Sequence, residues 1–350
     1  MELSWLMKLR IAAAAAVGVI LIGILAWPLA KPPELSGIVS LTSISLGRAI
    51  TLIALAILAG FLAYFFSWPY GLPIAILAAP AGLALWAVRT GDIAGLIQLN
   101  PNSLPYRQEV FASLKWEPLF WLLIVAAGFI GVLFAHITYY KNAKRPQISQ
   151  PSQDQAATKS KPHLWWLFEH TPVVAFLKIS LGFDADEILQ KPESEKPEQK
   201  SNSRLNIYLN SAVALVGSAL IAQVCMIIFA QDIKLFDSKL GSVVAQPAVG
   251  QIVFAVLLAF GIAAFVVKKF LDAGYIWPII ASAFITAFTV NIYGKQEILQ
   301  HLVQNQPANF FSSPIMAILP VQMVAFGTIG SIAGYWLAVR FNYWRQHESD

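Results

Sequence analysis

Long apolar stretches separated by polar segments run through most of the chain. Eight of them contain about 20 predominantly apolar residues, the length an α-helix needs to cross the hydrocarbon core of a bilayer. The third is short and contains Pro73 and Pro80, so we expect it to be kinked. The pattern predicts transmembrane helices at residues 9–29, 47–67, 71–88, 118–140, 206–230, 249–267, 274–293 and 314–338.

The first stretch also has features of a secretory signal peptide, because Lys8 and Arg10 precede its apolar run. The apolar region of a signal peptide has about 7–15 residues. Here the run extends from Ile11 to Trp27, and the Pro28-Leu29-Ala30 that follows is a poor cleavage site. We therefore interpret this stretch as a retained transmembrane helix.

Composition supports a membrane protein. Of the 350 residues, 57% are hydrophobic and 12% are charged, whereas a typical soluble domain has about 25% charged residues. The single cysteine, Cys225, excludes an internal disulfide and a cysteine-based metal site. A collagen-like chain, a disordered chain and a secreted disulfide scaffold are all excluded.

Basic residues are concentrated on one side of the predicted spans. Sixteen of the 24 Lys and Arg residues fall in the two termini, the central polar segment and the loop after the sixth span. Because positively charged segments tend to remain cytoplasmic, we expect both termini to be cytoplasmic, with the chain in a plasma or inner membrane. Since topology explains the net charge of +5, we expect no nucleic-acid partner.

The two halves of the chain share an order of features that suggests an internal duplication. If each copy has an even number of spans, it begins and ends on the same side of the membrane, so both copies have the same orientation. The sequence therefore predicts an all-α polytopic membrane protein with two tandem four-helix units of the same orientation, residues 1–140 and 206–350. The alternative is that apolar helices resemble one another through composition alone. The shared positions lie about 200 residues apart: Gly60 and Gly261, Pro73 and Pro278, Gly128 and Gly327, Gly131 and Gly330.

Residues 141–205 form a polar linker between the two predicted units. Two arms, 147–161 and 191–203, are rich in Pro, Ser, Gln, Lys and Glu, which predicts disorder. The apolar segment between them, 164–183, is interrupted by charged residues, and as a ninth span it would invert the second unit. We interpret it as helical and interfacial, anchored by Trp165 and Trp166. A docking helix for a partner protein is the alternative.

The predicted spans contain essentially no ionisable groups in their cores. Proton or sodium coupling, voltage sensing and intramembrane proteolysis would ordinarily need such groups. His136 is the one imidazole within a span, and it lacks a second ligand at similar depth, so we expect a hydrogen bond to a neighbour. We expect no catalytic, cofactor-binding or metal-binding residues.

A polar stripe in the seventh span consists of Ser282, Thr286 and Thr289, which share one helix face. The stripe is suited either to lining a path for a small neutral solute or to hydrogen bonding within and between helices. The corresponding part of the third span, residues 74–86, has alanines and Gly82 instead of hydroxyls. This asymmetry favours hydrogen bonding over a duplicated pore.

Small and amide side chains in the spans indicate close helix contacts. The candidate packing glycines are Gly128, Gly131, Gly327, Gly330 and Gly334. The amides expected to join helices are Asn210, Gln223, Asn291 and Gln322. Two amphipathic pieces, 93–99 and 297–303, predict short surface helices on the outer side.

These features favour a non-catalytic structural or scaffold subunit of a membrane assembly. Its partners would be the lipid bilayer and other membrane subunits, or further copies of this chain. The alternative is a channel or facilitator for a small neutral solute through the interface of the two repeats. An enzyme ranks third, because no acid/base pair, nucleophile or metal cluster is visible in the sequence.

Overall fold

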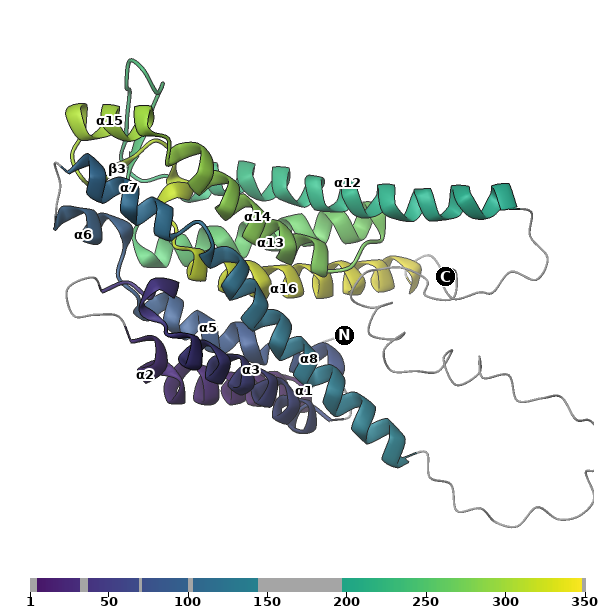
Figure 1. Ribbon diagram of the computed structural model, residues 1–350. Helices are drawn as coiled ribbons and strands as arrows, with labels where there is room; N and C mark the ends of the chain where they lie inside the picture. Colours follow the sequence, from purple (N-terminus) through teal and green to yellow (C-terminus); the bar gives the residue numbers. More distant parts are fainter. Residues whose placement is uncertain (1–4, 32–36, 69–70, 100–102, 144–196, 348–350) are drawn as a thin grey trace, which may run out of the picture.

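The computed structural model describes residues 5–31, 37–68, 71–99, 103–143 and 197–347. Within these ranges, eight helical segments are long and apolar enough to cross a membrane. The chain is predominantly helical (Figure 1). The prediction of a mainly helical chain with eight helices able to span a membrane is thus confirmed.

The first four spans are built around helices α1, α3, α5 and α8. Trp86 in α5 donates a hydrogen bond from its indole Nε1 to the carbonyl of Gly23, in the π-helical turn η1 that continues α1 (3.1 Å). The segments are α1 (Trp5–Gly18), η1 (Val19–Leu25), α2 (Trp27–Ala30), η2 (Leu41–Ser43), α3 (Leu46–Phe66), α4 (Leu72–Ala75), α5 (Ala78–Arg89), α6 (Ile93–Gln98), α7 (Leu104–Ser113) and α8 (Glu117–Ala143).

The expected kink in the third span is present as a break between α4 and α5. Pro73 lies in the first turn of α4, where its missing N–H leaves no intrahelical bond unmade. Pro80 lacks the N–H that would donate to the carbonyl of Ile76, at the break. Pro80 thus helps to divide one span into two helical pieces, while Pro73 starts the first of them.

The last four spans are built around α12, α13, α14 and α16. The eighth span was predicted from residue 314, but its long helix begins at Pro320 after a 3₁₀ turn. The segments are α12 (Pro197–Phe229), β1 (Lys234–Leu235), β2 (Val243–Ala245), α13 (Val249–Leu271), α14 (Ile276–Tyr293), α15 (Gln296–Asn305), β3 (Phe310–Phe311), η3 (Pro314–Ala317) and α16 (Pro320–His347).

Helix α12 begins earlier than the sequence indicated. Residues 197–203, expected to be disordered as part of the second linker arm, are its first two turns. Pro197 is suited to the first helical position, and a helix already nucleated in the span extends at little cost through Glu, Gln and Lys residues. The first arm and the interfacial segment 164–183 lie outside the described residues.

A small antiparallel sheet of order β1-β2-β3 was not predicted and qualifies the all-α class. Leu235 pairs with Val243 in the β1–β2 hairpin, and Val244 pairs with Phe311 of β3. Strands of two or three residues are too short to show an alternating pattern in the sequence. Together with α6, α7 and α15, the sheet forms what we call the cap (Figure 1).

The two sets of spans pack along a seam made by α5, α8, α14 and α16. Helix α16 packs against α5 and α8, and α14 packs against α8. Within the cap, α7 of the first set contacts α15 of the second. Figure 1 shows α1 beginning and α16 ending at the opposite end of the molecule from the cap.

Candidate functional site

Glycines bring the second and fourth spans of each half into backbone contact. A Cβ placed on Gly131 of α8 would overlap the carbonyl of Ile57 in α3. A Cβ placed on Gly330 of α16 would overlap the carbonyl of Leu257 in α13. These contacts join corresponding helix pairs in the two halves.

In each half, one further glycine of the fourth span faces the third span. Gly128 of α8 lies against the Cβ of Ala79 in α5, and a Cβ on Gly327 of α16 would lie 2.9 Å from the Cβ of Ser282 in α14. A Cβ placed on Gly334 of α16 would likewise overlap the carbonyl of Gly261 in α13. All five candidate packing glycines therefore lie where another helix leaves no room for a side chain.

The polar stripe of α14 is buried. Ser282, Thr286 and Thr289 are at most 6% exposed. Ser282 Oγ donates to the carbonyl of Ile279 (2.7 Å), and Thr286 Oγ1 donates to the carbonyl of Ser282 (2.9 Å). Because these two hydroxyls bond to their own helix and Ser282 faces α16, they act in packing in this structure.

Two of the four intramembrane amides connect different helices. Gln322 of α16 donates from Nε2 to the carbonyl of Ala87 in α5 (3.1 Å) and accepts from the N–H of Leu319 at Oε1 (3.0 Å). Asn210 of α12 donates to the carbonyl of Leu271 at the end of α13 (3.1 Å). Gln223, by contrast, is exposed on α12.

His136 forms the neighbour contact expected for it. Its Nδ1 lies 2.7 Å from the hydroxyl of Tyr64 in α3, so the pair joins α8 to α3. The two rings also meet edge to face. This histidine is therefore part of a contact between two helices.

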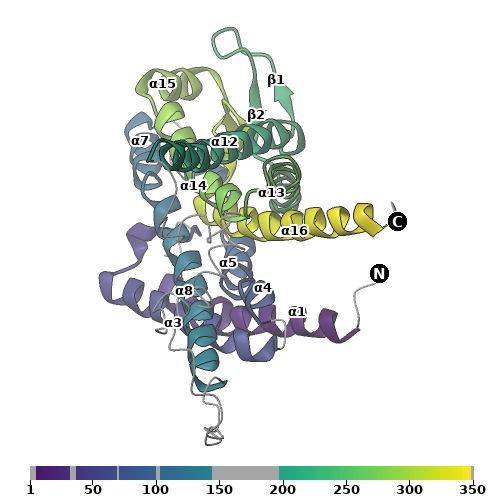
Figure 2. The same cartoon turned by 90° about the vertical axis from the view of Figure 1, so that its right-hand side faces the viewer.

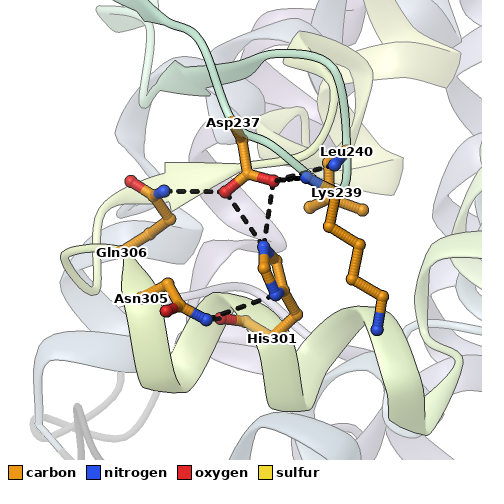
Figure 3. Close-up of polar contacts among 6 residues, drawn as sticks. All are labelled: Asp237, Lys239, Leu240, His301, Asn305 and Gln306. Atoms are coloured by element: carbon orange, nitrogen blue, oxygen red, sulfur yellow. Dashed lines mark hydrogen bonds and ion pairs between the residues drawn. The ribbon is translucent and has the colours of Figure 1, made fainter.

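A buried carboxylate organises the cap (Figure 3). Asp237, in the β1–β2 hairpin, accepts hydrogen bonds from the N–H groups of Lys239 and Leu240, both at 2.8 Å. His301 Nε2 lies 2.9 Å from both carboxylate oxygens, and Gln306 Nε2 donates at 2.9 Å. The carboxylate therefore fastens the hairpin to α15 and to the residue after it.

These donors stabilise the charged form of Asp237. The N–H of Leu240 contributes most, and the resulting hydrogen bonds hold the pKa of the carboxyl well below its usual range, against the opposing effect of burial. Asp237 and His301 are 64 residues apart in the chain. No local spacing in the sequence could have indicated their contact.

An Asp–His pair can serve general-base catalysis, but the His301 ring has no free nitrogen. The hydrogen-bond network assigns a proton to Nε2, which donates to Asp237, and leaves Nδ1 to accept from Asn305 Nδ2 (3.2 Å). In this structure both ring nitrogens of His301 thus have a neighbour within hydrogen-bond distance. No group of three or more His, Cys, Asp or Glu residues suited to a metal ion occurs in the described part of the chain.

Two ionisable side chains near the cap are more buried than the loop sequence suggested. Glu117 accepts hydrogen bonds from Ser40 Oγ (2.5 Å), Leu41 N (3.0 Å) and Trp121 Nε1 (3.4 Å), which fix the first long loop. Arg107 of α7 is 2% exposed, and its Nε and Nη2 have no hydrogen-bond partner among the described residues. A buried cation without compensation is energetically costly.

The predicted interfacial anchors Trp165 and Trp166 lie outside the described residues. Comparisons with models of protein families, with curated proteins and with solved structures find no match for this chain. Inference about function therefore depends on the contacts described above.

Proposed function

We propose that this chain is a non-catalytic structural subunit of a membrane protein assembly. The observation that carries the proposal is that polar side chains within the spans form hydrogen bonds to neighbouring helices or to their own helix. Gln322 and Asn210 bind carbonyls of neighbouring helices, and His136 binds Tyr64. Ser282 and Thr286 bond to their own helix at a packed contact. These groups hold helices together, which is what a subunit of fixed shape requires.

The same contacts weigh against a solute path along the polar stripe. A path for a polar solute needs hydroxyls that face an open, hydrated space. In this structure the three stripe residues are buried, and two of their hydroxyls are already bonded. These contacts therefore do not support a channel lined by the polar stripe.

We further propose that the chain consists of two tandem units, 1–140 and 206–350, inserted the same way. The glycine contacts support this arrangement, since Gly131 meets Ile57 where Gly330 meets Leu257, at equivalent positions of the two halves. A duplicated four-helix unit would retain such close contacts, because any side chain there collides with backbone.

We propose that the cap faces outward from a plasma or inner membrane and that both termini are cytoplasmic. The distribution of Lys and Arg supports this orientation. If the proposal holds, a topology reporter fused after Arg204 gives a cytoplasmic signal. An external signal from that fusion would refute the orientation, and a fusion after Lys239, in the cap, is the matched control expected to give the opposite result.

Affinity purification of the tagged full-length chain from its native membranes tests the structural role. The expected result is recovery of one or more membrane proteins in fixed proportion to the chain. A Gln322→Leu variant, which loosens the seam, is expected to lower the yield of the complex, while Gln223→Leu is the control. Recovery of the chain alone, together with solute flux through proteoliposomes containing it, would favour a facilitator.

A further inference from the structure

The β1–β2 hairpin presents an unusually exposed apolar surface. Phe236 is 85% exposed, more than any other large hydrophobic side chain of the described residues, and Ile233 and Leu235 are 62% and 44% exposed. We call these three residues the apolar tip. Lys234, between Ile233 and Leu235, and Lys239, three residues after Phe236, are also exposed.

The apolar tip is held in a fixed orientation. The carboxylate of Asp237, the residue after Phe236, is bound by His301, Gln306 and two N–H groups of the following turn (Figure 3). Leu235 pairs with Val243 of β2, which is fully buried in an apolar cluster with Leu302 and Phe310. The hydrogen bonds of Asp237 therefore fix the chain directly beside Phe236, whose side chain is exposed.

The hairpin lies close to the boundary of the bilayer. Ile233 is four residues beyond Phe229, the last residue of α12, and each residue extends the chain by at most about 3.6 Å. Ile233 is therefore within about 15 Å of the end of a span, and Phe236, seven residues beyond Phe229, is within about 25 Å. These distances let the tip reach the headgroup region. Figures 1 and 2 agree that the hairpin projects sideways, away from the bundle, at the end of α12.

We propose that residues Ile233–Lys239 are an interfacial membrane anchor that binds the lipid surface on the cap side. Ile233, Leu235 and Phe236 insert at the boundary between headgroups and acyl chains, where apolar and aromatic side chains are favoured. Lys234 and Lys239 lie beside them and bind anionic headgroups. This proposal requires only that the chain spans a membrane, and it is independent of the structural role proposed above.

A lipid surface fits this hairpin better than a protein groove. A protein partner would be expected to pair with β1, the edge strand, but that strand has only two residues, Lys234 and Leu235. The mixture of exposed apolar and lysine side chains next to a span is the composition of an interfacial segment. Contact with a protein partner is one of the outcomes that the following experiment can reveal.

Environment-sensitive fluorophores on single cysteines test the proposal. Cys225 is the only cysteine in the chain, so Cys225→Ala provides a background for Phe236→Cys and, as a control on the exposed face of α15, Gln300→Cys. The purified full-length protein is placed in nanodiscs of zwitterionic lipid, with or without phosphatidylglycerol. We expect the label at position 236 to be blue-shifted and quenched by lipids carrying spin labels near the headgroup, and the label at position 300 to remain water-exposed.

Two results would overturn the anchor. One is equal quenching and emission of the two labels in nanodiscs. The other is shielding of position 236 in native membranes but not in nanodiscs, which would assign the hairpin to a protein partner. The double variant Lys234→Gln, Lys239→Gln is expected to abolish the additional blue shift that phosphatidylglycerol gives. If phosphatidylglycerol gives the wild-type lysines no additional shift, their role is refuted. Recovery of the chain alone from native membranes would leave the anchor standing while refuting the structural role.

Discussion

The side-chain amide of Gln322 donates a hydrogen bond to the main-chain carbonyl of Ala87, joining residues 235 positions apart. Gln322 lies at the start of α16, and Ala87 lies near the end of α5. The bond therefore connects the two sets of spans within the apolar seam. Both groups are buried, so loss of either partner leaves an unsatisfied polar atom.

Substitution of Gln322 should weaken the seam. Gln322→Leu removes the bonds to the carbonyl of Ala87 and the N–H of Leu319, and we expect a loss of about 1–2 kcal/mol in the free energy of unfolding. Thermal denaturation of the purified chain in detergent measures the effect. Gln223→Leu, on the exposed side of α12, should leave stability nearly unchanged. Equal stability of the two variants would show that the amide does not hold the seam.

The glycine contacts should be equally sensitive in both halves. Gly131→Ala and Gly330→Ala each place a methyl group against a carbonyl of a neighbouring helix, and we expect each to cost about 1–3 kcal/mol. Gly217→Ala is the control, because nothing lies within 4 Å of a Cβ at that position of α12. There the higher helix propensity of alanine should stabilise by up to about 1 kcal/mol. A marked effect in only one half would contradict the two-unit arrangement.

The sequence predicted the parts of this fold that depend on segment length and local patterning. Eight spans, the break near Pro80 and the short helices α6 and α15 follow from apolar length, missing N–H groups and amphipathic spacing. The cap sheet was missed because its strands have two or three residues. These elements form only when distant segments pack on one another.

The polar groups of the cap depend on tertiary contacts in the same way. Asp237 and His301 meet because the hairpin folds against α15, which cannot be inferred from either segment alone. Arg107 is buried on a helix that packs against α15, in the other half of the chain. In the sequence it was one charged residue of a polar loop.

Acid should leave the cap intact until the pH is very low. The pKa of Asp237 is lowered in the folded chain, so its contribution is fully present above the unfolded-state value of about 3.9 and is lost as the pH falls below it. Hydrogen exchange at the N–H groups of Lys239 and Leu240 reports this contact. We expect strong protection from pH 7 to about pH 4 and little in Asp237→Ala, which has no side-chain acceptor, throughout. Equal protection in both proteins would contradict the anchoring role.

Arg107 offers a test of buried charge. Arg107→Met retains much of the apolar side-chain volume and removes a cation without a described partner, so we expect the melting temperature of the purified chain to rise. A gain of about 1 kcal/mol corresponds to roughly 2 °C for a chain of this size. Arg107→Lys keeps the charge and should give no gain. A lower melting temperature for the methionine variant would indicate that an anion from outside the described residues pairs with Arg107.

The mass of the native complex tests the structural role most directly. The full-length chain, extracted from its own membrane in polymer-bounded lipid discs, can be measured by native mass spectrometry as bound lipids are removed. We expect a species heavier than the 38.3 kDa chain by at least one further protein subunit, of this chain or another, that persists after lipid removal. A single chain carrying only lipid would contradict the proposal that it works as a structural subunit of an assembly.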